Sequence, residues 1–545
     1  MSERGALDRG DWPWLLSLLI VGCLALGTFA LAAYRFTDGQ GGVPLDDAWI
    51  HFQFARNLAR GDGLSFNPGD PTSGSTAPLW TLLLAAVYRV GGRFPVGGQA
   101  LSGVCFLALL VVTYALGKRL AGSRWAAWLA GALVAVNGRM VWAGLSALET
   151  CLFAALTLWA IGAHLGDVRA GVYRARTAAL FALAALSRPE GYLLFALSLA
   201  DFAWHTGRQV NATRNTNQEP RVACCVLRVA CCVLRSVLLP AAVFTALVSP
   251  YLLFSLFTSG HLLPNTYHAK AVVDLRPDTA FLSVAARYLV LDNPILLPLY
   301  VLGVALLFWP RLSPLRPGLR ASLLGLWSAG LPLVYAFLHA VLYQHGRYLI
   351  PLVPCNALIG LVGLLGAQRL AHRRGWLHVL LVPQGSWGRP RGGIWVRLVV
   401  ITLLIVAGTA WRLPTMARLY AWNVDNINEM HVALGRWVVA HTAPDALLAL
   451  NDIGAITYIS ERPVLDLAGL ITPEVVPILH MAERDARLAD LLTEQGVDYV
   501  LVFPNWFPDL AERRDLLEPV HRVTLERNTI CGGQTMVVYR AHWRR

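Results

Sequence analysis

The sequence that decides the fold is WLLSLLIVGCLALGTFALAAY at residues 14–34, followed by PLDDAWIHF at residues 44–52. The first run has about 20 mostly apolar residues, the length that crosses a bilayer as one helix. It has no clear small-residue cleavage site, so we expect a retained signal anchor. Just beyond it stand Asp46 and Asp47. Two adjacent carboxylates at the edge of a membrane are costly to keep and usually have a function.

The rest of the chain has the same apolar character. Of its 545 residues, 56% are hydrophobic and 14% are charged, with a mean hydropathy of +0.51, whereas soluble proteins carry about 25% charged residues. The net charge of +13 could indicate nucleic-acid binding. The arginines, however, cluster in alternate loops, as they do in the cytoplasmic loops of membrane proteins. We therefore predict a polytopic α-helical membrane protein that binds membrane lipids and no nucleic acid.

We predict about 11 spans, with a cytoplasmic N-terminus and the C-terminal tail outside. They are expected near residues 14–34, 97–117, 124–143, 149–166, 172–187, 191–204, 236–257, 292–309, 321–343, 348–366 and 396–411. Residues 78–90 are apolar but too short to span comfortably, so we predict an interfacial or re-entrant helix on the outer side. Ser187–Gly191 contains Pro189 and should divide a longer apolar run into two spans.

Three regions follow from this pattern. Residues 1–411 form the membrane domain with an outer loop at 35–96, residues 412–424 are a linker, and residues 425–545 form a small α/β domain. In that domain the apolar runs and periodicity predict buried strands, helices and a closing edge strand. These lie at Leu447–Leu450 and Tyr499–Phe503 (strands), 427–441 and 484–495 (helices), and Val537–Tyr539 (edge strand).

Residues 222–235 contain the sequence VACCVLR twice in succession. Its cysteines could suggest a metal site, but their spacing fits no zinc motif. We interpret the segment as a sequence duplication.

With this topology, acids and bases from separate span ends share one outer surface. The candidate site residues are Asp46, Asp47, Glu149, Arg188, Glu190, Asn265, His268, Lys270, His345 and Arg347. Carboxylates can deprotonate a hydroxyl or hold a metal, and lysine or arginine can hold a phosphate. A phosphate at a membrane surface most simply belongs to a lipid. A lipid-phosphate leaving group together with a base for an alcohol describes glycosyl transfer.

Residues 46–60 are predicted to form an amphipathic helix with Trp49 and Phe52 on its apolar face. Asp46 and Asp47 would lie in its first turn, where the helix dipole favours the ionised carboxylate. An ionised carboxylate suits a base or a metal ligand. The alternative is that Asp46 only caps the helix.

The stretch DDAWIHFQFARNL at 46–58, followed by GDGLSFNPG at 61–69 and TAPLW at 76–80, resembles the first outer loop of GT-C superfamily glycosyltransferases. It looks closest to the terminal arabinofuranosyltransferase-like branch. Residues 188–191 and 264–270 and the pair Arg347-Tyr348 also look like family elements. The resemblance implies an inverting hexosyl- or pentosyltransferase of the bacterial plasma membrane. Such an enzyme would transfer sugar from a polyprenyl-phosphate donor to an extracytoplasmic glycan, lipid or protein acceptor.

The resemblance also assigns roles. Asp46 matches the acidic residue that the family uses as a base, and Asp47 matches its neighbour, which is sometimes tied to a divalent cation such as Mg²⁺ or Mn²⁺. Glu149 falls where relatives place a second acidic residue. Lys270 and Arg347 fit contacts to the donor phosphate, and Arg188 is a further cation for the same group. Glu190, Asn265, His268 and His345 are expected to support them.

Other functions remain open at this point. A transporter or lipid-linked sugar flippase would hold its ionisable residues near the bilayer midplane, often in repeated halves. Here they cluster at span ends, and the Asp46-Asp47 loop has no second copy. A scaffold with an inactive core would have less need for these acids and bases. An O-antigen ligase or polymerase is a further alternative.

Overall fold

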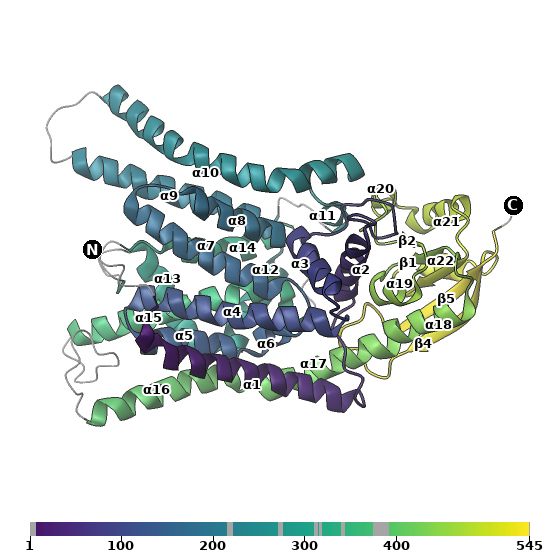
Figure 1. Ribbon diagram of the computed structural model, residues 1–545, viewed down its shortest axis with the longest axis horizontal. Coiled ribbons are helices and arrows are strands. Elements are labelled where there is room, and N and C mark those ends of the chain that lie inside the picture. Colours follow the sequence, from purple (N-terminus) through teal and green to yellow (C-terminus); the bar gives the residue numbers. More distant parts are fainter. Residues whose placement is uncertain are drawn as a thin grey trace.

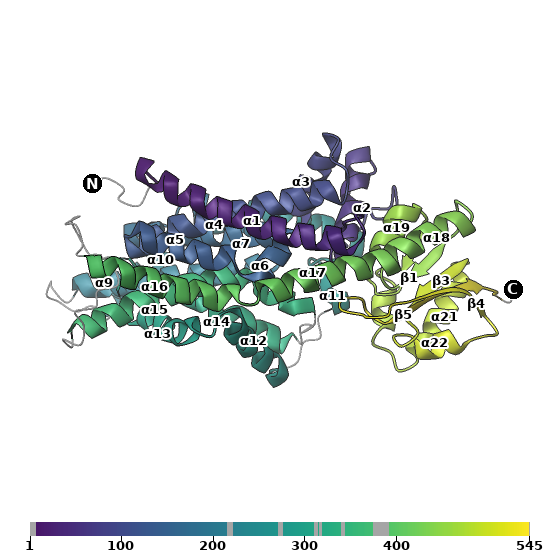
Figure 2. The ribbon, with the colours of Figure 1, turned by 90° about the horizontal axis from the view of Figure 1, so that it is seen from below.

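The computed structural model describes residues 7–214, 222–270, 276–309, 314–315, 319–338, 344–373 and 392–543. It shows a bundle of long helices with a small α/β domain at one end (Figure 1). The N-terminus lies at the far end of the bundle and the C-terminus lies in the small domain, in both views (Figures 1 and 2). The predicted architecture, a helical membrane protein with a C-terminal α/β domain, is thus confirmed.

The described helices include six that are long and apolar enough to cross a membrane. They are Arg9–Phe36, Val96–Ala121, Thr150–Ala170, Val237–Ser259, Gln344–Ala371 and Val399–His441. Two bent helix pairs raise the number to up to eight, and two apolar helices are shorter. The predicted 11 spans are therefore not confirmed, because several apolar runs fold as short or bent helices.

The bundle helices have the following bounds. They are α1 (Trp12–Phe36), α4 (Val96–Ala121), α5 (Arg124–Ala135), α6 (Gly138–Gly144), α7 (Thr150–Ala170), α8 (Ala175–Ser187), α9 (Glu190–Arg214), α10 (Val222–Ser259), α12 (Thr279–Asp292), α13 (Leu296–Phe308), α14 (Ser322–Phe337), α15 (Val353–Arg373) and α16 (Gly392–Ala410). Short 3₁₀ segments precede two of them, η1 (Arg9–Asp11) before α1 and η2 (Gln344–Leu352) before α15. As predicted, the chain breaks at Arg188-Pro189, between α8 and α9. The side chains of the 222–235 repeat lie outside the described residues.

Two helices of the outer loop, α2 (Asp47–Arg60) and α3 (Pro78–Arg89), lie between the bundle and the small domain (Figure 1). The helix predicted at 46–60 is confirmed, and Trp49 and Phe52 of its predicted apolar face pack into the bundle core. Phe54, on another side of the helix, packs into the core of the small domain. The helix is therefore covered on that side by a domain from the other end of the chain.

The small domain is built on a five-stranded sheet of order β2-β1-β3-β5-β4. Its strands are β1 (Leu448–Leu450), β2 (Val464–Asp466), β3 (Tyr499–Val502), β4 (Leu517–Thr524) and β5 (Thr535–Ala541). Strand β1 is parallel to β2 and β3, and β5 is antiparallel to β3 and β4. The helices are α18 (Ala433–His441), α19 (Gly454–Ser460), α20 (Val475–Ile478), α21 (Arg484–Glu494) and α22 (Pro508–Glu512). A short helix that follows α10, α11 (Asn265–Lys270), lies near this domain (Figure 1).

Strands predicted at Leu447–Leu450 and Tyr499–Phe503 are confirmed, but the predicted edge strand is wrong. Val537–Tyr539 belongs to β5, which is paired on both sides. The edges are β2 and β4. Sequence reasoning missed β4 because half of its residues are exposed, it includes Pro519 and it shows little apolar patterning. Proline is tolerated at a sheet edge, where a missing N–H breaks no ladder.

Bundle and domain are joined by helical backbone. The expected linker, residues 412–424, is not a loop: from Leu413 onward it forms most of α17 (Leu413–Ile427). Helix α17 continues through a wide π-helical turn, η3 (Asn428–Val432), into α18. Helices α16, α17 and α18 run along one side of the molecule into the small domain (Figure 2). Turns of this kind often occur at functional sites. Here the turn carries His431, which is fully buried against the outer loop.

Candidate functional site

A charged cavity of about 270 Å³ lies where α2, α7, α9, α11 and α14 meet the chain at 347–348. It is lined by Asp47, His51, Thr76, Leu148, Glu149, Thr150, Arg188, Pro189, Glu190, Leu193, Thr266, Tyr267, Leu331, Val334, Tyr335, Leu338, Arg347 and Tyr348. Half of the predicted site residues thus meet in one cavity, here called the donor cavity. One part of its wall is charged, and the part from α9 and α14 is largely aliphatic.

An ion pair joins α2 to the chain before α15. Arg347 Nη1 donates to Asp47 Oδ2 at 2.6 Å, and the guanidinium lies 5.1 Å from the ring centroid of Tyr348. Asp47 is the first residue of α2, so its carboxylate stands at the end of the helix where the dipole favours negative charge. The pair therefore presents a carboxylate and a guanidinium side by side at the cavity wall.

A second charged group stands on the opposite helices. Arg188 donates to Glu149 Oε1 at 2.7 Å and to Glu190 Oε1 at 2.6 Å, and Tyr335 also donates to Glu190. His51 Nε2 lies 3.5 Å from Glu149 Oε2. Although burial opposes it, the bond from His51 and the charge of Arg188 lower the pKa of Glu149 to about 2. Glu149 is therefore ionised, and Arg188 is already engaged by two carboxylates.

The position of Arg347 depends on an unusual bend. Gln344, His345 and Gly346 all have positive φ angles of 58°, 61° and 62°. Arg139 on α6 holds this bend by donating to the carbonyl oxygens of His345 and Gly346, each at 3.0 Å. Only glycine fits at position 346, because a Cβ atom would lie 2.4 Å from the ring of Tyr288. His345 does not line the donor cavity; its Nε2 pairs with Asn423 Oδ1 at 2.8 Å.

Asp46 points away from the donor cavity. Its two carboxylate oxygens each accept a backbone N–H, from Gly454 and Ala455, at 2.8 Å. It makes no capping bond to its own helix and instead caps α19 of the small domain. Burial raises the pKa of Asp46 to about 6, against the lowering effect of nearby His431. The ionised state expected from the dipole of α2 is thus opposed by burial under the domain.

Asp46 lines a smaller cavity of about 110 Å³ beneath the domain, here called the domain cavity. Its wall includes Asn451, Asp452, Trp506 and Cys531, and Asp47 and Arg347 line it as well. Within it, His431 Nε2 lies 2.9 Å from Asp452 Oδ2, and His431 Nδ1 lies 3.9 Å from Cys531 Sγ. The Asp47–Arg347 pair is therefore the wall that the two cavities share.

The chain can be compared with known protein families and with solved structures. Residues 423–543 match the family described as Domain of unknown function (DUF8728), and no curated protein matches the chain. The chain is similar to ArnT from Cupriavidus metallidurans solved with undecaprenyl phosphate, at 12% identity and a TM-score of 0.59, over 98% of both chains. It is also similar to the oligosaccharyltransferase AglB from Archaeoglobus fulgidus, at 13% identity and a TM-score of 0.54, over 91% of this chain and 70% of that one.

The chain has the GT-C fold. The resemblance noted at residues 46–80 is thereby confirmed as to fold. At 12–13% identity, similarity to these structures shows the fold alone. Any inference about chemistry must therefore come from the residues that line the donor cavity and the domain cavity.

Two other predicted residues, Asn265 and His268, line neither cavity. Asn265 is buried; its backbone N–H donates to Ser73 Oγ at 3.3 Å, and its side chain donates to the carbonyl of Gly469. It therefore ties the outer loop to the small domain. The ring centroid of His268 lies 4.3 Å from that of His261, away from both cavities. The side chain of Lys270 lies outside the described residues.

Sequence reasoning missed several residues that line the two cavities. His51 follows Asp47 by four positions, so the two share a helix face, and this spacing could have revealed it. Tyr335 lies within an apolar span and gave no signal. His431 and Trp506 belong to the small domain, whose packing against Asp46 no local pattern indicates.

The expected role of Asp47 as a ligand of Mg²⁺ or Mn²⁺ stays a prediction. These ions prefer several oxygen ligands at once. In the described part of the chain, no three His, Cys, Asp or Glu side chains are close enough to hold an ion. The described donors thus do not fit a metal site.

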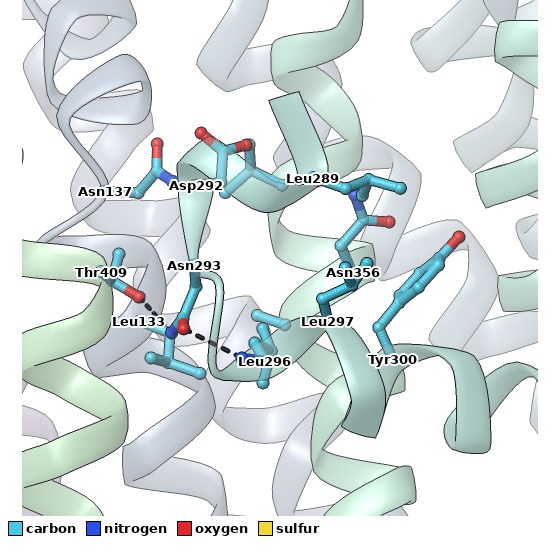
Figure 3. A pocket seen from close by; sticks show the side chains of 12 residues that line it. Leu133, Asn137, Leu289, Asp292, Asn293, Leu296, Leu297, Tyr300, Asn356 and Thr409 are labelled. Atoms are coloured by element: carbon cyan, nitrogen blue, oxygen red, sulfur yellow. Dashed lines mark hydrogen bonds between the residues drawn. The ribbon is translucent and has the colours of Figure 1, made fainter. Parts of the chain in front are cut away.

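A further cavity of about 30 Å³ in the GT-C bundle is structural (Figure 3). Asn293, at the sharp bend between α12 and α13, donates to Thr409 Oγ1 at 2.8 Å and accepts from the backbone N–H of Leu296 at 2.9 Å. These bonds satisfy backbone and side-chain groups that the break in the helix leaves exposed. The lining of this 30 Å³ cavity contains none of the predicted site residues.

Proposed function

We propose that this protein is an integral membrane glycosyltransferase. It transfers a sugar from a polyprenyl-phosphate donor to a glycan, lipid or protein acceptor at the outer face of a bacterial plasma membrane, with its N-terminus cytoplasmic and its small domain outside. The observation that supports this most is the Asp47–Arg347 pair, which lies at 2.6 Å between two cavities of different character.

The donor cavity suits a lipid-linked sugar. The aliphatic side chains of Leu193, Leu331 and Val334 fit the isoprenoid chain, and Arg347 fits the phosphate. A guanidinium matches phosphate oxygens in a bidentate manner. Arg188 is less suited to this contact than expected, because Glu149 and Glu190 already occupy it.

Asp47 is the better placed base. Both oxygens of Asp46 are held by backbone N–H groups, whereas Asp47 lines both cavities. In the proposed reaction, Asp47 takes the proton of the acceptor hydroxyl, the hydroxyl oxygen bonds to the anomeric carbon, and the bond from that carbon to the phosphate oxygen breaks. Attack from the face opposite the phosphate inverts the anomeric centre.

Arg347 links donor binding to this step. The incoming phosphate competes with Asp47 for the guanidinium, which strengthens the carboxylate as a proton acceptor. As the bond to the phosphate breaks, Arg347 stabilises the growing charge on the leaving group. The acceptor hydroxyl is proposed to enter through the domain cavity, because it meets Asp47 from the side away from the lipid.

The test is a transfer assay on membranes that contain the full chain, with a panel of radiolabelled polyprenyl-phosphate sugars. We expect a glycosidic product with at least one donor, and chelator arms test the cation prediction. Movement of the lipid-linked sugar across the membrane without any new glycosidic bond would instead indicate a flippase. Transfer that is unchanged in correctly folded Asp47→Asn would rule out the proposed base.

A further inference from the structure

A third cavity, about 270 Å³, lies behind the bend that carries Arg347. It is formed by α6, α12 and α17 at the end of the bundle nearest the small domain (Figures 1 and 2). Its lining comprises Arg139, Val284, Arg287, Tyr288, Leu291, His345, Arg412, Met416 and Leu419. It shares no residue with the donor cavity or the domain cavity.

The lining carries an excess of positive charge. Arg139 is paired with Asp292 at 2.8 Å and lies over the ring of Tyr288 at 4.1 Å. In the described part of the chain, neither Arg287 nor Arg412 forms an ion pair, although Asp292 also feels the charge of Arg412. Three guanidiniums line the cavity and one of them is paired with a carboxylate, so a bound anion would reduce the excess of positive charge.

Apolar side chains line and surround the same cavity. Its remaining wall includes Val284, Leu291 and Leu419. Nearby, Val290, Ile295 and Trp411 are 42%, 43% and 59% exposed, which places large apolar side chains at the surface. A tryptophan beside an arginine at a helix end is typical of the membrane–water interface. A ligand here can place an anionic group on the arginines and acyl chains along the helices.

We infer that this cavity binds the phosphate of an anionic membrane phospholipid, with Arg287 and Arg412 as its main contacts. Basic pockets between membrane helices bind lipid headgroups through the same chemistry. Binding of a lipid in this cavity does not require the proposed transfer reaction.

A lipid in this cavity would contact residues that hold the bend carrying Arg347. Arg139 holds the carbonyl groups of His345 and Gly346, and the ring of Tyr288 packs against Gly346. A phosphate that orders α12 and α17 therefore also braces the bend from behind.

The experiment measures lipid binding to the purified full chain in detergent by native mass spectrometry. We expect retention of phosphatidylglycerol over phosphatidylcholine, and a loss of affinity of about tenfold or more in the double variant Arg287→Gln/Arg412→Gln. The matched control is Arg418→Gln, an exposed arginine on α17 that lies outside the cavity. It should leave binding unchanged.

Equal retention of the two lipids would overturn the inference, as would an equal loss in Arg418→Gln, which would indicate ordinary interfacial arginines. A competition arm uses inorganic phosphate. If phosphate alone displaces phosphatidylglycerol at equal concentration, the ligand is a free anion and the lipid assignment is wrong. Failure of phosphate to compete supports the intact lipid.

Discussion

The donor cavity and the domain cavity meet at one ion pair but differ in every other respect. The donor cavity is walled by bundle helices, with aliphatic side chains from α9 and α14 and the buried Arg188 group. The domain cavity is walled mainly by the small domain, with His431, Asp452 and Trp506. Such a contrast suits two reactants of opposite character, a lipid on one side and a polar acceptor on the other.

The two neighbouring aspartates, Asp46 and Asp47, have partners in different parts of the molecule. Successive residues of a helix point about 100° apart. Asp47 therefore reaches the ion pair with Arg347, while Asp46 reaches α19 of the small domain. The carboxylate of Asp47 thus stands at the wall of both cavities, and that of Asp46 joins the outer loop to the small domain.

The largest expected effect is on the rate of transfer, and it distinguishes Asp47 from Asp46. Asp47→Asn should lower the rate of transfer by about 10²–10⁴-fold, because it removes a general base. Asp46→Asn should lower it far less, since an amide oxygen still accepts one N–H of α19. Initial rates at saturating donor measure both. Equal losses in two well-folded variants would place the base on Asp46 or on neither residue.

The next effect concerns the wall of the donor cavity. Arg188→Met should destabilise the protein by about 3–5 kcal/mol, because it leaves two buried carboxylates without their cation. Thermal unfolding in detergent measures the change in melting temperature. The control is Arg487→Gln, whose ion pair is 61% and 69% exposed and should matter by less than about 0.5 kcal/mol. A similar melting temperature for both variants would contradict the prediction.

Near pH 6 we expect a pH effect on the domain side. The pKa of Asp46 is raised by burial from 3.8 to about 6, so the folded protein binds this proton more tightly than the unfolded chain. The associated stability, up to about 3 kcal/mol, is fully present below the unfolded value and is lost as the pH rises through about 6. Hydrogen exchange of the segment around Gly454, corrected for intrinsic rates, should therefore quicken with pH. Asp46→Asn should abolish that dependence, and its persistence in the variant would assign the effect to another group.

The smallest effect distinguishes the two cavities by substrate. Trp506→Ala should raise the acceptor KM by about tenfold, a loss of about 1.4 kcal/mol, and leave the donor KM unchanged. Leu331→Ala should do the reverse, since Leu331 lines only the donor cavity. Steady-state kinetics with each substrate varied in turn measures both. A Trp506 variant that changes only the donor KM would contradict the proposed entry of the acceptor.

Much of the site was predictable because membrane spans constrain it strongly. Asp47, Glu149, Arg347 and the pair Arg188 and Glu190 come from four separate places in the chain, and all five residues line the donor cavity. The partner of Asp46 was not predictable, because it lies 408 positions away in the chain. The number of spans also escaped prediction, since a bent pair such as α12 and α13, at 115°, has the same apolar composition as a straight helix.

The sequence by itself determined that this is a multi-pass membrane protein whose charged residues gather at helix ends. Hydropathy and segment length act locally, and hydrocarbon does not tolerate unpaired charge. Only the tertiary structure decided which aspartate faces which cavity and which arginines remain without a carboxylate. Those outcomes depend on helix rotation and on contacts between segments hundreds of residues apart, and no local pattern encodes them.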